Sequence, residues 1–576
     1  PSRPGTHSYL FNLPAAYRTL PVVSIVTDRD HLTGPLGIIG ISNVIQQSDG
    51  TYIPADATGY HNPSKHGLAW ERPTSVEWIR PEDNSGFQID CGLRVQGSDY
   101  QRPRTTASSK FSFRLYFRGD YGPGRLEYPL FPLSSVQSFD QLVLRAGFNE
   151  QGNPFIRDEL TRRLSHDMGQ VASHGNFAVV LVNGVAYASA PYYNPCERVH
   201  EEFLQSHLGG SDEWDVVGPT FAQGAGEAGV IDGDRADFRS LVSFINTQPV
   251  TNPPVYLEAA RRLDLVNFVD YLLLNVYCAM GDWPQNNWRA GKDRSTAGPW
   301  RFIVWDGEWA MGIYGRGVTT NMFTNNGPGP TAGGLASTGD SEIAQMYQRL
   351  YQNPEFRLLW ADRIHKQMFN GGALTDSNIV ARFNQMRTEL SGVIPSMNTD
   401  ILTTWVPQRR AIIFGHFDQF GLMASSNAPV FNQHGGPVAR GFPLSMTAPG
   451  IGGTIYFTTN GSDPRVMFSG AVATGALAYT APLALNQTLT IRARTLHTGR
   501  WSALTEATFT VALPGVPLRI TEIHYHPPTL EGSASEFLEI QNVGGAALDL
   551  GGMSFDGIAF RFNEGTWLAP GAMLVL

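Results

Sequence analysis

Four polar residues lie close together in two short stretches that are rich in tryptophan. Asp282 and Asn287 belong to GDWPQNNW (281–288), and Asp306 and Glu308 belong to FIVWDGEWAMG, which follows soon after. A long apolar helical pattern precedes the first pair and an apolar strand pattern precedes the second, so we expect all four side chains at one end of the fold. Carboxylate and amide oxygens are the ligands that Mg²⁺ and Mn²⁺ prefer. The stretches therefore predict chemistry on a hydroxyl group beside a divalent cation.

The Asp-x₄-Asn spacing of Asp282 and Asn287 is that of a protein-kinase catalytic loop. In such a loop the Asp orients the attacking hydroxyl, the Asn holds a metal ion, and a later Asp holds metal that bridges the phosphates. The spacing alone is common, and the alternative is a capping Asp and a turn-forming Asn beside Pro284.

A kinase-like site also needs a lysine on a strand before the loop and an acid on a helix to orient it. The chain has only four lysines among its 42 Lys and Arg residues, so each retained lysine is of interest. Lys110 opens the strictly alternating stretch KFSFRLYFR (110–118), and the following helical pattern supplies Asp158 or Glu159. A compact ammonium at Lys110 fits contact with phosphate; the alternative is an exposed lysine on a strand.

Length and composition set limits on the class of protein. A chain of 576 residues predicts two to four domains, and a net charge of −9 argues against a general nucleic-acid binder. Three scattered cysteines (Cys91, Cys196, Cys278) allow at most one disulfide and no zinc site. No apolar run reaches the length of a membrane span. Because the sequence starts at Pro1, an export signal is expected to lie outside it.

Composition along the chain predicts an α+β protein of several units. Residues 1–19 read as a linker, and 20–425 as one domain with a β-rich part over 20–195 and a helical part over 196–425. Helices are predicted at 154–169 and 263–280, and a hairpin around Asn183-Gly184. Short strands with turns then predict a β-sandwich over 428–513 and a second one, incomplete, over 515–576.

The order of five motifs resembles the CotH kinase family, which is named for spore coat protein H. The motifs are GLRVQGSDYQRPRTTASSKFSFRLYFRGDYG, IRDELTRRLSHDMG, PYYNPCERVHEEFL, GDWPQNNW and WRFIVWDGEWAMG. The resemblance covers roughly residues 20–425 and implies an atypical two-lobed protein-kinase fold. It also implies the use of ATP and Mg²⁺ or Mn²⁺, and phosphorylation of Ser or Thr in secreted or surface proteins.

Carried over by position, the resemblance makes Asp282 the catalytic acid, and Asn287 and Asp306 metal ligands. Lys110 would be the phosphate-holding lysine. Glu308 stands where the family usually has a second Asp, and its longer side chain changes the reach of a metal ligand.

The resemblance also places the phosphate-covering loop at 94–104, where Arg102 and Arg104 could touch phosphate. That segment has less glycine than the covering loop of a standard kinase. Glu159 is the cofactor-binding acid expected beside Lys110. Glu197, near the linker between the lobes, is expected to be structural.

The two C-terminal units resemble immunoglobulin-like modules. TIYFTTNGSDPR resembles the C-terminal domain of chitobiases and hexosaminidases, and ITEIHYHPP with EFLEIQNVGG resembles a lamin tail domain. Such modules imply an extracellular or bacterial cell-surface location, with a surface glycan or protein as their partner. The sequence thus leaves two hypotheses: an ATP-dependent protein kinase, or an inactive kinase-fold surface protein that binds nucleotide or glycan. Retention of Lys110, Asp282 and Asp306 together favours the enzyme.

Overall fold

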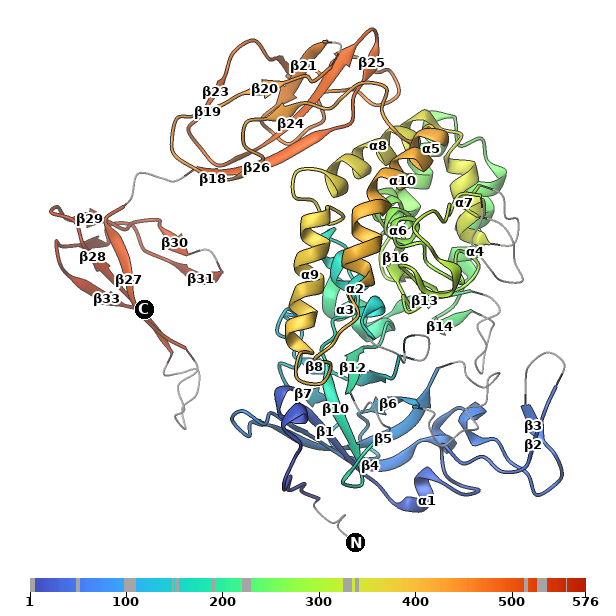
Figure 1. Cartoon of the computed structure of the whole chain (residues 1–576). Coiled ribbons are helices and arrows are strands. Elements are labelled where there is room, and N and C mark those ends of the chain that lie inside the picture. Colours follow the sequence, from blue (N-terminus) through green and yellow to red (C-terminus); the bar gives the residue numbers. More distant parts are fainter. Residues whose placement is uncertain are drawn as a thin grey trace. The chain divides into compact units, whose positions relative to one another are not determined.

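The chain forms two compact units, residues 1–424 and residues 425–576. The computed structural model describes residues 6–47, 52–97, 110–147, 150, 155–187, 192–219, 229–324, 334–336, 341–450, 452–511, 516–525, 536–555 and 557–576. Figure 1 shows strands gathered near the N-terminus, helices in the middle of the chain and strands again toward the C-terminus.

An eight-stranded sheet forms the first part of unit 1. Its strands in spatial order are β1 (Val22–Val26), β4 (Arg72–Ile79), β5 (Gly86–Gln96), β6 (Ser112–Tyr116), β9 (Gln141–Arg145), β12 (Tyr192–Glu197), β10 (Ala178–Val182) and β11 (Val185–Ala186). β1 also pairs with β10 in parallel, so the sheet closes on itself. The predicted hairpin at Asn183-Gly184 is confirmed, with Val182 opposite Val185.

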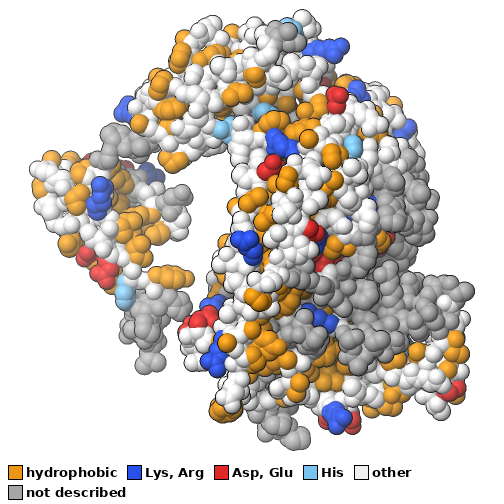
Figure 2. Space-filling view, viewed as in Figure 1, with side chains coloured by type: hydrophobic (Ala, Val, Ile, Leu, Met, Phe, Trp, Pro, Cys, Tyr) orange, Lys and Arg blue, Asp and Glu red, His pale blue; other side chains and the backbone are white. Residues whose placement is uncertain are grey.

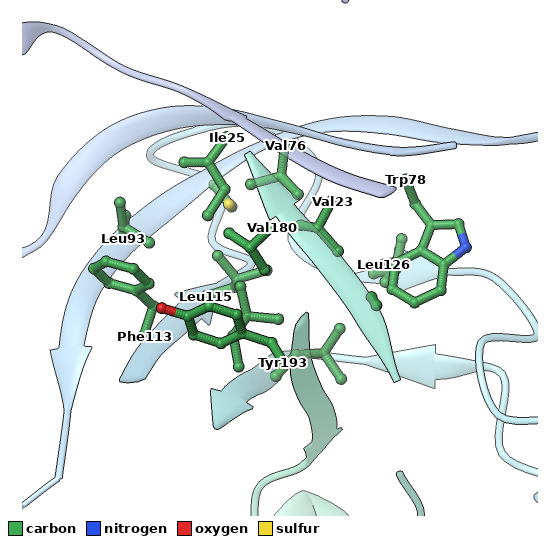
Figure 3. Close-up of a cluster of buried hydrophobic side chains, with 14 of the residues drawn as sticks. Val23, Ile25, Val76, Trp78, Leu93, Phe113, Leu115, Leu126, Val180 and Tyr193 are labelled. Carbon is green, nitrogen blue, oxygen red and sulfur yellow. The ribbon is translucent and has the colours of Figure 1, made fainter. Parts of the chain in front are cut away.

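Alternate side chains of these strands fill the interior of the sheet. Figure 3 shows Val23, Trp78, Phe113, Val180 and Tyr193 pointing into this shared core. The predicted alternation of 110–118 is confirmed, because Phe111, Phe113, Leu115 and Phe117 are all buried in this core. The residues between them, including Arg114, therefore lie on the other face of the sheet.

The helical part of unit 1 begins with α2 (Arg157–Asp167), which follows β9. The remaining helices are α3 (Glu201–Leu208), α4 (Ala236–Thr247), α5 (Pro253–Arg262), α6 (Leu265–Cys278), α7 (Glu342–Leu350), α8 (Pro354–Met368), α9 (Asp376–Glu389), a π-helical turn (Ile401–Trp405) and α10 (Val406–Gln419). α6 confirms the helix predicted over 263–280: Asp264 caps its first turn and nearly every side chain is buried. α6 packs against α2 and α8, so a buried helix leads straight into GDWPQNNW.

A four-stranded sheet packs against the helix α6 through its strand β16. Its order is β14 (Val230–Asp232), β13 (Trp214–Val217), β15 (Trp288–Asp293) and β16 (Arg301–Val304). Phe302 of β16 stacks at a tilt on Phe268 and Tyr271 of α6. This packing fixes the β15–β16 hairpin against the helix.

Short elements complete unit 1 within the described residues. They are a 3₁₀ turn (Ala15–Thr19), α1 (Arg29–Leu32), β2 (Val44–Gln46), β3 (Tyr52–Pro54), 3₁₀ turns at Asn62–Ser64 and Leu68–Trp70, β7 (Leu126–Glu127), β8 (Ser138–Phe139) and a 3₁₀ turn (Ile313–Gly315).

Unit 2 is built of strands. Its first part holds β17 (Val430–Phe431), β18 (Gly436–Val438), β19 (Phe442–Leu444), β20 (Met446–Thr447), β21 (Thr454–Thr458), β22 (Leu477–Ala478), β23 (Leu483–Leu485), β24 (Leu489–His497), β25 (Arg500–Trp501) and β26 (Thr505–Val511) around its own core. Its second part holds β27 (Leu518–His524), β28 (Phe537–Asn542), β29 (Leu548–Asp549), β30 (Ser554–Phe555), β31 (Ile558–Arg561), β32 (Trp567–Leu568) and β33 (Met573–Val575), with a smaller core.

Figure 2 shows basic and acidic side chains scattered over the visible face, with no broad basic patch among the coloured residues. All three cysteines are buried and unpaired. Within the described ranges, no helix combines the length and the apolar character that a bilayer crossing requires.

Candidate active site

The β15–β16 hairpin brings Asn287 and Asp306 to one end of the second sheet. Trp288, the first residue of β15, pairs with Val304, the last residue of β16. Asn287 directly precedes this pair and Asp306 follows it by two residues, so both lie where the hairpin opens. Two predicted metal ligands that are far apart in the chain thus share one location.

Backbone hydrogen bonds hold the Asp282 segment beside the Asp306 segment. The amide of Gly281 donates to the carbonyl of Trp309 over 2.5 Å, and the amide of Met311 donates to that of Cys278 over 2.9 Å. A Cβ on Gly281 would lie 2.4 Å from the Trp309 ring, so only glycine permits this approach. The carboxylates of Asp282 and Asp306 are therefore carried by two segments that run side by side.

Left-handed backbone conformations concentrate at this place. Asp282, Asn287 and Asp306 have φ values of 53°, 54° and 60°. Asp and Asn tolerate this region better than most residues, yet it is sparsely populated. Such conformations cluster at functional sites, where the surrounding structure over-determines them. Here β15, β16 and the hydrogen bonds to Trp309 supply that support.

Asp282 is held by its own loop. Asn286 Nδ2 donates to Asp282 Oδ2 over 2.7 Å, and Gln285 Nε2 donates to Oδ1 over 3.4 Å. The tryptophans of the loop are packing residues: Trp283 and Trp288 are buried, and Trp283 Nε1 donates to Tyr271 Oη. The loop is thus anchored by its tryptophans and leaves Asp282 half-buried.

Arg145, at the end of β9, lies at the centre of the acidic residues. Its guanidinium forms ion pairs with Asp158 of α2 at 3.0 Å, with Asp306 at 2.5 Å and with Glu308 at 2.7 Å. Burial alone would lower the pKa of Arg145, but the three carboxylates outweigh it and raise that pKa above its usual value. Arg145 therefore joins the sheet, the helix α2 and the Asp306 segment through charge.

The Arg145–Asp158 pair was missed by sequence reasoning, which looked for a lysine. In protein kinases a lysine on the third strand pairs with an acid of the helix that follows, and together they position the phosphates. Here the strand before α2 is β9, its cation is Arg145, and its partner on α2 is Asp158. Burial would raise the pKa of Asp158, but Arg145 and Arg162 hold it below its usual value. The signal in the sequence is the cation that ends FDQLVLR, just before the helix.

Lys110 lies near the same acids but on a different element. It precedes β6, and its Nζ donates to the carbonyl of Tyr192 over 2.5 Å and sits 4.4 Å from the ring centre of Tyr193. Burial lowers the pKa of Lys110 to about 7, although the charge of Glu308 opposes that shift. Glu308 is thus an acid whose charge favours the protonated form of Lys110.

The predicted pairing of Lys110 with Glu159 is corrected by these contacts. The Glu159 carboxylate is buried and accepts from Arg162, Arg163 and Asn194. Because α2 turns Glu159 toward these residues and Asp158 toward Arg145, the two neighbouring acids face different partners. Glu159 has the contacts of a structural residue, and Asp158 takes the place of the helical acid at the site.

Four further predicted residues have different outcomes. Arg102 and Arg104 lie outside the described residues. Glu308 is buried and reaches Arg145, so it belongs to the same cluster of charges as Asp306. Glu197 is buried and accepts from His207 Nε2 over 2.8 Å, a contact within the framework.

The closed sheet, the helix after β9 and the acids on two adjacent segments define a protein-kinase-like domain. The sequence model described as CotH kinase protein matches residues 93–406, more than half of the chain. The chain therefore belongs to the CotH kinase family.

A second family model matches part of unit 2, and one solved structure resembles the chain weakly. The sequence model described as Fn3 associated matches residues 444–509, within the sandwich predicted over 428–513. Among solved structures, the crystal structure of CtkA, a Helicobacter pylori proinflammatory kinase, is similar at 9% identity and a TM-score of 0.19. That likeness covers 56% of this chain and 95% of CtkA. The comparison with curated protein sequences gives no match.

Proposed function

We propose that this chain is an ATP-dependent protein kinase that transfers the γ-phosphate of ATP to Ser or Thr hydroxyls of a protein substrate. The observation that supports this most is the convergence of Asp282 and Asp306 on adjacent backbone segments, with Asn287 at the mouth of the same hairpin. A protein that only binds nucleotide does not need a proton-accepting carboxylate beside the metal ligands.

The donor atoms fit a hard divalent cation, Mg²⁺ or Mn²⁺. Asn287, Asp306 and Glu308 offer amide and carboxylate oxygens and no nitrogen or sulfur. These three residues would hold the metal, which supplies charge neutralisation for the phosphates when bound. Arg145 pairs with Asp306 and Glu308 in this structure, so its charge compensates the two carboxylates that would face the metal.

The remaining residues act directly on the reactants. Asp282 accepts a hydrogen bond from the acceptor hydroxyl and orients its oxygen toward the γ-phosphorus. Arg145 and Lys110 bring positive charge to the phosphate chain, Arg145 through a planar fork and Lys110 as a compact ammonium. Catalysis in this class is mostly positioning and charge stabilisation, which is what these residues supply.

The test is phosphoryl transfer from γ-labelled ATP to the protein itself and to Ser-rich and acidic protein acceptors, with Mg²⁺ or Mn²⁺. Wild type, Asp282→Asn, Asp306→Asn and the exposed control Asp212→Asn would be compared. We expect label on wild type and control, and a loss of roughly 10²-fold or more in both site variants.

Two outcomes would contradict the proposal: the first rejects the enzyme and the second rejects this site. If wild type transfers no label while ATP still raises its melting temperature, the chain is a nucleotide-binding protein with a kinase fold. If label persists in Asp282→Asn and Asp306→Asn, the transfer occurs at another site and these residues are not catalytic.

We also propose where the protein acts and what unit 2 contacts. A secreted or cell-surface kinase would carry unit 2 as a module that contacts a surface glycan or protein, and the resemblance of 515–576 to a lamin tail stays a prediction. Immunolabelling of intact cells of the source bacterium, with and without permeabilisation, tests this; label only after permeabilisation would contradict it.

A further inference from the structure

Four arginines of unit 1 gather near the candidate active site and form what we call the arginine cluster: Arg94, Arg114, Arg198 and Arg289. Arg94 of β5 and Arg114 of β6 are directly opposite each other across the strand pair. Their guanidinium carbons lie 5.1 and 5.4 Å from the ring centre of Tyr116. Like charges at opposed positions of a sheet repel and destabilise the pair.

The other two members meet at Trp305, the residue before Asp306. Arg198, which follows β12, and Arg289 of β15 lie 5.1 and 4.8 Å from the centre of the Trp305 ring. Arg145 lies 5.9 Å from the same ring. The arginine cluster is therefore continuous with the residues that hold the Asp306 segment.

None of the four guanidiniums has an ion pair with a carboxylate of the described chain. Arg114 donates to the amide oxygens of Gln96 and Gln141, and Arg289 donates to a main-chain carbonyl. Arg198 is only 9% exposed, and its side chain donates to no described group. The Nε atoms of Arg94 and Arg289 are buried without a partner.

This arrangement is costly for the protein alone. Burial lowers the pKa of Arg198 well below its usual value, and Arg114 and Arg289 lower it further. Asp232 favours the Arg198 charge, but its carboxylate accepts from the amide of Glu201 and forms no ion pair with Arg198 among the described residues. Buried charges persist in proteins when something compensates them, which points to an anionic ligand.

We propose that the arginine cluster binds the phosphate chain of the nucleotide, so that phosphate contacts rather than contacts to the base dominate nucleotide affinity. This deepens the proposed function and rests on ATP being the phosphoryl donor. Guanidinium forks match phosphate oxygens in bidentate geometry, and four such groups suit a ligand with several charges. Trp305 links the cluster to Asp306, so a chain of phosphates can reach from the cluster to the metal ligands. A purine base, by contrast, needs apolar surface, and here the exposed part of the Trp305 ring is shared among three guanidiniums.

Calorimetric binding of four probes to the whole chain tests the proposal: tripolyphosphate, ATP, GTP and adenosine, at fixed ionic strength with Mg²⁺. We expect ATP and GTP to bind within about threefold of each other, tripolyphosphate to bind clearly, and adenosine to bind at least about 100-fold more weakly than ATP. Adenosine binding as tightly as ATP, or no binding of tripolyphosphate, would overturn the proposal.

Substitutions of Arg198 and Arg289 test whether the anion binds at the arginine cluster. Arg198→Met and Arg289→Met should each weaken tripolyphosphate and ATP by about tenfold or more, whereas Arg198→Lys keeps the charge and should lose less. The matched control is Arg387→Met, an exposed arginine on α9. Equal loss in the control, or no loss in either cluster variant, would show that the anion binds by general attraction and refute the site.

Asp282→Asn separates this proposal from the proposed function. The variant is expected to lose transfer and keep nucleotide binding, because Asp282 contacts the acceptor and not the phosphates. A wild type that binds tripolyphosphate through Arg198 but transfers no phosphate would sink the kinase and leave the anion site standing.

Discussion

Two groups of arginines on neighbouring elements of unit 1 have opposite surroundings. On α2, Arg162 and Arg163 are buried against carboxylates: Arg162 contacts Asp158 and Glu159, and Arg163 contacts Glu159 and Glu389. In the arginine cluster, Arg198 and Arg289 are largely enclosed with no carboxylate ion pair among the described residues. The same residue type thus has two uses, one within the framework and one facing a ligand.

The difference follows from where each group sits. α2 packs against α6, α9 and β16, and its charged side chains between Arg157 and Arg163 are buried, so they must be satisfied internally. The arginine cluster draws on β5 and β6 of the eight-stranded sheet, the residue after β12, and β15 of the four-stranded sheet, and two of its members contact Trp305 beside the Asp306 segment. The arginines of α2 are satisfied by carboxylates of the protein, whereas the clustered arginines without such partners are candidates for binding a ligand.

Breaking the paired group should have the largest effect on stability. Arg162→Met removes a buried partner shared by Asp158 and Glu159, which keep Arg145 and Arg163 respectively. We therefore expect a loss of about 3 kcal/mol of unfolding free energy, the lower end of the cost of breaking a buried ion pair. Urea unfolding followed by tryptophan fluorescence measures it, with Arg387→Met as control. A loss below about 1 kcal/mol would show that the paired arginines are not what stabilises α2.

Arg145 shares a feature with each group, because it is paired with carboxylates and also adjoins Trp305. Arg145→Met should lower phosphoryl transfer by roughly 10²–10³-fold, as when one charge-stabilising donor is removed from a site. Arg145→Lys keeps the charge without the fork and should retain measurable transfer. Steady-state rates with γ-labelled ATP decide this. Equal activity of wild type and Arg145→Met would remove Arg145 from the site and restore the phosphate-holding role to Lys110 alone.

Local patterns predicted much of this fold. The alternation at 110–118 and the apolar run at 263–280 each report a local period, so the strand face and α6 could be read directly from sequence. The position of Asn287 and Asp306 could also be anticipated, because each is adjacent to a strand of one hairpin. These features depend on local patterns or on the two strands of a single hairpin.

The features that sequence could not give depend on distant partners. Arg145 contacts Asp158, Asp306 and Glu308, and only the closed sheet and the packing of α2 bring them together. The opposition of Arg94 and Arg114 depends on the register between β5 and β6, which no local pattern specifies. The search for a lysine also hid Arg145, since a kinase motif names the residue type and not the strand order.

The paired region also contains a histidine, His166, that stays uncharged because its pKa is lowered. His166 of α2 stacks on His174 at 4.0 Å, and burial, with His174, lowers the pKa of His166 to about 3. The unfolded chain binds this proton near pH 6.5, so stability should fall as the pH drops from about 6.5 toward 3. His166→Phe should remove about 2 kcal/mol of the loss between pH 8 and pH 5. Parallel pH profiles of unfolding for the two proteins would contradict this.

The smallest expected effect gives the sharpest test of the comparison, because its sign is opposite to that of Arg162→Met. Arg198→Met removes a buried charge with no acid partner, so the unfolding free energy should stay unchanged or rise by up to about 1 kcal/mol. Tripolyphosphate should then reverse the order, because a ligand stabilises the form that binds it and wild type binds it more tightly. Thermal unfolding of wild type, Arg198→Met and Arg387→Met with and without tripolyphosphate measures both effects. If Arg198→Met lost as much stability as Arg162→Met, Arg198 would be a paired framework residue, and the distinction between the two groups of arginines would fail.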